Sequence, residues 1–115
     1  MVNSRTDLLD EIFFALSDPT RRALIARLAE GEASVAELSE PFAISPPAIS
    51  KHLRVLERAG LLQQTRCGRQ RQCVLQAEPL REASEFVARY RKFWTHQLDN
   101  LQQYLEEPQT KETEP

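Results

Sequence analysis

The chain has 115 residues, enough for one domain with a single core. Hydrophobic residues make up 41% and charged residues 28%, which is the balance of an ordinary globular protein and argues against fibrous or low-complexity classes. No apolar run approaches the ~18 residues that cross a membrane, and no signal peptide is evident, so we expect a cytoplasmic protein with no membrane partner. We expect a single domain over residues 1–108 and a disordered, polar tail over 109–115.

The net charge of −2 hides an uneven distribution. Between Ser45 and Cys73 there are six basic residues and one acidic residue, a local charge of +5 that leaves −7 for the rest of the chain. A basic block in an otherwise acidic chain indicates a surface for a polyanion such as DNA, and the acidic remainder would repel DNA from the other faces.

The first predicted helix covers about residues 7–17. Leu8, Ile12 and Leu16 form one apolar stripe along it. Leu9 and Phe13 form a second stripe beside the first. Such a broad apolar face predicts contact with two neighbours at once.

Capping signals predict the next two helices. Asp18 followed by Pro19 is an N-cap with proline at the first helical position, and Gly31 is expected to end that helix. Ser34 and Glu37 are spaced as a capping box, which predicts a short third helix.

A fourth helix and a hairpin follow. Ser45 predicts an N-cap for a helix over about residues 46–59, which Gly60 ends. Residues 61–76 are typical of two strands, and Gly68 supplies the positive φ that a tight turn between them needs.

One long helix is predicted over about residues 79–107. Its apolar residues recur at spacings of three and four, close to a coiled-coil seam, and are too many for one small domain to cover. We therefore expect a dimer that covers this seam. The expected interface residues are Leu9, Phe13, Val87, Tyr90, Trp94, Leu98, Leu101 and Leu105.

This order, α-α-α-α-β-β-α, predicts a mainly α (α+β) winged helix-turn-helix fold. At 100° per residue the fourth helix places Ile49, Leu53 and Leu56 on one side and a basic face opposite. The predicted partner is double-stranded DNA. The expected DNA-binding residues are Ser45, Pro46, Pro47, Ser50, Lys51, His52, Arg54 and Arg58 on the helix and Arg66, Arg69 and Arg71 on the wing.

Residues 45–62 (SPPAISKHLRVLERAGLL) strongly resemble the reading helix of ArsR/SmtB-type winged helix-turn-helix repressors. Residues 15–28 (ALSDPTRRALIARL) resemble the second helix of that family, and Gly68-Arg69 its wing turn. The resemblance covers roughly residues 8–106. It implies a homodimer that is joined through the first and last helices and represses transcription from a short inverted repeat.

The metal-sensing signatures of that family are missing. Ser34, Val35 and Ala36 stand where metal-sensing members carry Cys-Val-Cys, and the last helix has only His96 where others carry Asp-x-His and a second histidine. Because soft metals need several thiolate or imidazole ligands, we expect no metal site and no cofactor.

The two cysteines are expected to remain unpaired. With the turn centred on Cys67 and Gly68, cross-strand partners sum to about 135, which places Cys73 opposite Leu62, beyond disulfide reach of Cys67. We expect Cys73 to be a small buried residue. A redox role for Cys67 at an exposed tip is the alternative.

Other functions fit less well. A protein-interaction module with an incidental basic face is one alternative. An enzyme is disfavoured because the two histidines lie on different helices and no nucleophile-elbow or phosphate-loop motif is present. The last helix carries an aromatic cluster, which we expect in the core or in the dimer interface; a small apolar effector between subunits is the alternative. The cluster comprises Phe86, Tyr90, Phe93 and Trp94.

Overall fold

The computed structural model describes residues 4–112, and it divides the chain into two compact units. The first unit extends to Ala83 and the second begins at Ser84, inside a helix. Each unit is described by itself.

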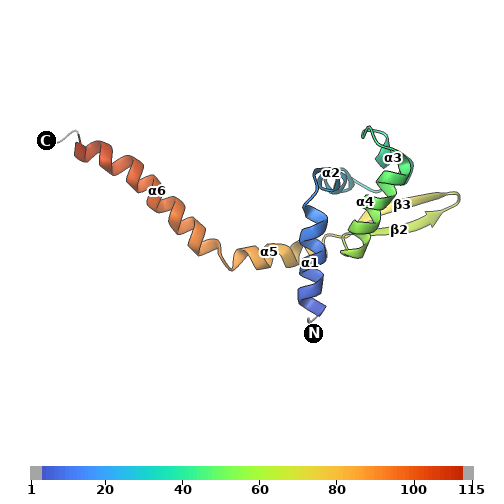
Figure 1. The fold of residues 1–115 in the computed structure, drawn as a ribbon, viewed down its shortest axis with the longest axis horizontal. Coiled ribbons are helices and arrows are strands. Elements are labelled where there is room, and N and C mark those ends of the chain that lie inside the picture. The colour runs from blue at the N-terminus through green and yellow to red at the C-terminus, as the bar shows by residue number, and fades with distance from the viewer. Residues whose placement is uncertain (1–3, 113–115) are drawn as a thin grey trace. The chain divides into compact units, whose positions relative to one another are not determined.

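The first unit combines helices with a small antiparallel sheet (Figure 1). Its elements are α1 (Ser4–Leu16), α2 (Pro19–Leu28), β1 (Ala33–Ser34), α3 (Val35–Ser39), α4 (Pro46–Arg58), β2 (Leu62–Cys67), β3 (Gln70–Leu75) and the start of α5 (Glu78–Ala88). The strand order is β1-β3-β2. The sequence prediction lacked β1, because a two-residue strand has no periodicity and forms only by pairing with β3.

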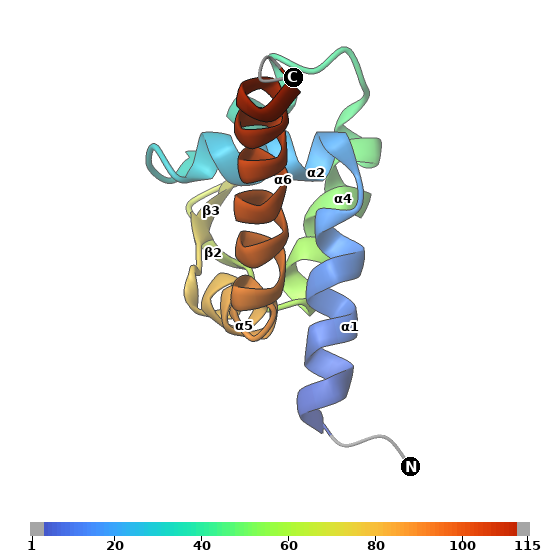
Figure 2. The same ribbon diagram turned by 90° about the vertical axis from the view of Figure 1, so that its left-hand side faces the viewer.

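One hydrophobic core holds the first unit together. Figure 2 shows α1 beside α4, and Ile12 of α1 is fully buried together with the apolar stripe of α4. Leu24 and Leu28 of α2 and Cys73 of β3 complete the same cluster. Each Å² of apolar surface removed from water contributes about 25 cal/mol to stability. The burial of this stripe therefore determines which face of α4 points to solvent.

The predicted helix starts are confirmed. The Asp18 side chain accepts from the backbone N–H of Arg21 at 3.1 Å, and the Ser45 side chain accepts from that of Ala48 at 3.4 Å. Ser34 and Glu37 form the full capping box at the start of α3. These local hydrogen bonds satisfy backbone donors that a helix start leaves unpaired.

The hairpin has a different register from the predicted one. Gly68, at φ +64°, and Arg69 form a two-residue turn, so Cys67 faces Gln70 and Cys73 faces Gln64 rather than Leu62. No non-glycine residue that the structure describes has a positive φ, so glycine stands at the first central turn position, as a type II′ turn requires. The predicted register was wrong because it centred the turn about one residue too early.

The second unit holds the end of α5 and α6 (Arg91–Glu112). The helix predicted over 79–107 is thus interrupted at Arg89 and Tyr90, where backbone N–H groups bond three residues back, to Phe86 and Val87. No proline or glycine marks this break, so periodicity alone could not locate it. Residues 109–112 of the predicted disordered tail belong to α6, and 113–115 lie outside the described residues.

The capping box makes stability depend on pH. The backbone N–H of Ser34 donates to Glu37 Oε1 at 2.8 Å and, as the main cause, lowers the pKa of Glu37 below its ordinary value of 4.5. Because the folded-state pKa is depressed, the stability contributed by ionised Glu37 is present above pH 4.5 and is lost as pH falls through the folded-state pKa. A Glu37→Gln variant should therefore lose less free energy of unfolding than the wild type on acidification.

Urea denaturation followed by circular dichroism at neutral pH and below pH 4.5 measures this difference. Glu40→Gln removes a carboxylate from the other end of the same helix and is the charge-matched control. Equal acid sensitivity of the wild type and Glu37→Gln would contradict the prediction.

Candidate nucleic-acid interface

The fourth helix presents the face that its sequence predicts. Ile49, Leu53 and Leu56 are completely buried, and the opposite side of α4 is exposed. That exposed side carries Pro47, Lys51, Arg54 and Arg58. With α3 packed against α4, the pair forms the helix-turn-helix, and the connecting segment covers residues 40–45.

The wing is tied directly to α4. Strand alternation places Arg66 and Arg71, which are cross-strand partners, on the same face of the hairpin as buried Cys73. On that face Arg71 Nη2 donates to Ser50 Oγ of α4 at 3.3 Å. This hydrogen bond joins the wing to the helix. We call the basic residues of both elements together the reading surface; they are Lys51, Arg54 and Arg58 of α4 and Arg66, Arg69 and Arg71 of the wing.

Two of the wing cations repel each other in the free protein. Arg66 and Arg71 are both exposed, and like charges directly opposite each other in a sheet are unfavourable. Arg69 is exposed in the turn. The hairpin of β2 and β3 extends past α4 (Figure 1). An anion such as a phosphate would relieve this repulsion, which favours nucleic acid as the ligand of the reading surface.

His52 is the half-buried member of the predicted set. Its Nδ1 atom lies 3.1 Å from Arg21 Nη1 and 4.0 Å from Asp18 Oδ2. The backbone N–H of Arg21, donating to the Asp18 carboxylate, is the main cause that lowers the pKa of Asp18. These contacts place His52 on a flank of α4, beside the start of α2.

Sequence reasoning missed Arg21, which is only 7% exposed. The sequence feature that could have indicated its role is its place at the third position of α2, in a first turn that holds no acidic residue. A cation there opposes the helix dipole, so its presence calls for another partner.

The two cysteines have the exposure that the sequence predicts. Cys73 is buried and Cys67 exposed, and both are free thiols. Burial raises the pKa of Cys73. Cys67 lies opposite Gln70, about 10 Å along the strand from Cys73 and on the other face of the hairpin, so a disulfide would need a large rearrangement.

The second unit exposes an apolar row along the end of α5 and along α6. Between 44% and 58% of each side chain in this row is exposed; the row comprises Val87, Tyr90, Trp94, Leu98, Leu101 and Leu105. Of the other predicted interface residues, Phe13 is 39% exposed and Leu9 is half-buried against the core. The Phe86 and Tyr90 rings lie 5.6 Å apart across the helix break.

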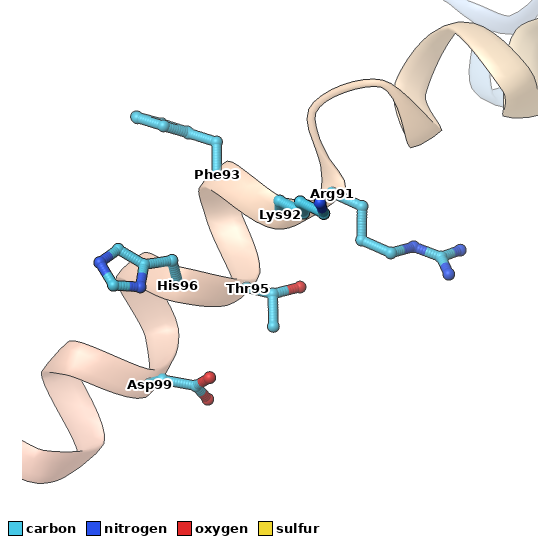
Figure 3. A pocket seen from close by; sticks show the side chains of 6 residues that line it. All are labelled: Arg91, Lys92, Phe93, Thr95, His96 and Asp99. Atoms are coloured by element: carbon cyan, nitrogen blue, oxygen red, sulfur yellow. The ribbon is translucent and has the colours of Figure 1, made fainter.

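A shallow hollow on α6 is the candidate place for an effector (Figure 3). All six lining residues come from this one helix, with Phe93 and His96 projecting to one side and Thr95 and Asp99 to the other. Every one of them is exposed, so the hollow has no enclosing wall within the described part of the chain.

Residues 4–112 hold no group of three or more His, Cys, Asp or Glu side chains arranged to bind a metal ion. None of the helices in the same range combines the length and hydropathy of a membrane span.

The chain is similar to known transcriptional regulators. Residues 16–65 match the model of a helix-turn-helix domain family. The HTH-type transcriptional regulator Rv2034 of Mycobacterium tuberculosis is 37% identical over 97 residues, covering 84% of this chain and 88% of that protein. The transcriptional repressor SdpR of Bacillus subtilis is 38% identical over 60 residues, covering 52% of this chain and 67% of that protein.

A solved structure of a transcriptional regulator is also similar to this chain. The crystal structure of an ArsR family transcriptional regulator superimposes with a TM-score of 0.73 at 38% identity, covering 78% of this chain and 93% of that one. The fold and its basic surface define a winged helix-turn-helix DNA-binding protein. The chain belongs to the ArsR/SmtB family of transcriptional regulators, as the sequence resemblance indicated.

The thiols give a direct test of the hairpin. Cys67 should react rapidly with a thiol reagent such as Ellman's reagent, and Cys73 only after unfolding, because it is buried with a raised pKa. Counting the thiols that react in native buffer and in denaturant measures the accessibility of each cysteine. In Cys67→Ser the rapid phase should disappear, whereas a rapid phase that persists would place Cys73 at the surface.

Proposed function

We propose that the protein is a homodimeric transcriptional repressor that binds a short inverted repeat, with α4 in the major groove and the wing over flanking phosphates or the minor groove. The observation that carries this proposal is the reading surface, in which the basic face of α4 and the arginines of the wing are joined by the Arg71–Ser50 hydrogen bond. Repression is supported by the relatives, one of which is named a transcriptional repressor.

A second copy of the chain is the proposed occupant of the apolar row. Exposed apolar side chains in a row of this length are uncommon on monomers and typical of an interface. A two-fold dimer would present two reading helices to adjacent major grooves, about 34–36 Å apart, and would therefore match a palindromic site.

Helix and wing should differ in what they read. Arg54 lies in the part of α4 that would enter the major groove, where arginine pairs with guanine, so Arg54→Ala should cost about 1–3 kcal/mol on the specific site and little on random DNA. Arg69 on the narrow turn should contact phosphate, so Arg69→Ala should weaken both kinds of DNA and lower the salt slope by about one.

The measurement is titration of each variant on two duplexes at several salt concentrations. One duplex is selected by the wild-type protein from a random-sequence library, and the other is a scrambled sequence of equal composition. Relaxed base preference in Arg69→Ala with a uniform loss in Arg54→Ala would reverse the proposed roles. Binding that does not depend on salt would favour a protein-interaction module instead.

The dimer is tested in the apolar row. Replacing Leu98 and Leu101 with glutamate would place like charges in the proposed interface, so the double variant should be monomeric at micromolar concentration. Sedimentation velocity measures the mass. The matched control replaces Gln102 and Gln103, polar residues of the same turn, with glutamate and should remain dimeric. A dimeric Leu98→Glu/Leu101→Glu variant would show that the interface lies elsewhere.

A further inference from the structure

The flank of α4 holds a hollow with a strongly basic wall, which we call the basic hollow. It is lined by Arg21, Lys51, His52, Arg54, Val55 and Arg58. Four of these six side chains are cationic and none is acidic. A concave surface of this charge concentrates anions, and a DNA phosphate is the anion that α4 would meet.

Arg21 determines which nitrogen of His52 carries the proton. A guanidinium has five N–H donors and no acceptor, so Nδ1 of His52, 3.1 Å from Arg21 Nη1, must accept. The proton of a neutral ring is then on Nε2. The Asp18 carboxylate would favour the opposite arrangement, but at 4.0 Å it is beyond hydrogen-bond distance from the same nitrogen.

Arg21 itself is held on three sides. Its Nε donates to the carbonyl of Ala15 at 2.8 Å, and its Nη2 donates to that of Phe14 at 2.9 Å. The guanidinium also lies 5.0 Å from the centre of the Phe14 ring. These contacts at the end of α1 leave Nη1 aimed at His52, so the hydrogen bond to the imidazole comes from a donor that cannot turn away.

The Nε2 atom of His52 is the group left for a ligand. Among residues 4–112 no hydrogen bond is formed by this atom, although the ring lines the basic hollow. We propose that Arg21 is a positioning residue for DNA binding: it holds the His52 imidazole as the Nε2–H tautomer, which donates to a phosphate oxygen in the basic hollow. This inference rests on the proposed DNA-binding function of α4.

The tautomer is tested first in the free protein. Long-range ¹H–¹⁵N NMR spectra distinguish a ring nitrogen that carries a proton from one that does not. The chain has two histidines, so His52→Gln assigns the signals of His52 and leaves those of His96. At neutral pH we expect an unprotonated Nδ1 and a protonated Nε2. A ring protonated on Nδ1 would overturn the proposal.

DNA binding is then compared between two substitutions of His52 on the selected and scrambled duplexes. His52→Gln keeps an acceptor toward Arg21 and an N–H donor, so it should bind within about twofold of the wild type. His52→Leu keeps neither and should bind both duplexes about tenfold more weakly, which is the loss expected for one hydrogen bond to a charged group. Equal losses in the two variants would overturn the proposal.

The salt dependence separates a neutral donor from a cation. A neutral Nε2–H releases no counterion, so His52→Leu should leave the salt slope unchanged. A slope that falls by about one would mean that His52 binds phosphate as an imidazolium. In that case Arg21 does not determine which form of the His52 ring binds phosphate.

Arg22 offers a matched control for Arg21. Arg22 also donates to the end of α1, from Nη1 to the carbonyl of Leu16 at 2.8 Å, but it is exposed on the neighbouring position of α2. Arg21→Lys keeps the charge but loses the planar set of guanidinium N–H donors. It should therefore weaken binding to both duplexes about tenfold and alter the His52 ring signals. Arg22→Lys should do neither, and equal effects of the two would reduce Arg21 to a structural role.

Failure of this inference can be told apart from failure of the proposed function. If the wild type binds neither duplex, both are wrong. If the wild type binds and only the His52 and Arg21 results depart from expectation, the DNA-binding function stands and the positioning role of Arg21 is wrong.

Discussion

The burial of one stripe of α4 is the constraint on which the reading surface depends. Ile49, Leu53 and Leu56 are fully buried in the core, which removes any freedom of the helix to rotate about its axis. Since residues on opposite sides of a helix are fixed relative to each other, the buried stripe alone directs Lys51, Arg54 and Arg58 outward. The cations need no partner of their own to be held in place, and they remain available for a ligand.

The wing depends on the same core through β3. Cys73 is buried beneath the sheet, and the alternation of side chains along β3 then places Arg71 on the side of α4. A shift of register by one residue would move Arg71 to the opposite face and break its hydrogen bond with Ser50. The two-residue turn at Gly68 therefore matters for DNA binding through register, as well as through the charge of Arg69 beside it.

Features set by neighbouring residues could be predicted from the sequence, and features set by distant residues could not. The N-caps at Asp18, Ser34 and Ser45 are local hydrogen bonds between residues three apart, so their residue types identify them. The pairing of β1 with β3, and the contact of Arg21 with His52 across 31 residues, arise only in the folded chain. The basic face of α4 lies between these cases, because helical phase predicts it once the helix bounds are known.

The break between α5 and α6 changes how the apolar row can act. A continuous helix would hold the row as one straight seam, whereas the junction at Arg89 and Tyr90 is formed by three-residue hydrogen bonds and separates Val87 from the residues on α6. In the proposed dimer, α6 would carry most of the contact with the second copy, since four of the six residues of the row lie on it. The spacing of the two reading surfaces would then depend on the geometry of this junction. Because an inverted repeat is recognised only when its half-sites match that spacing, a ligand that altered the junction would change DNA affinity without touching a base or a phosphate.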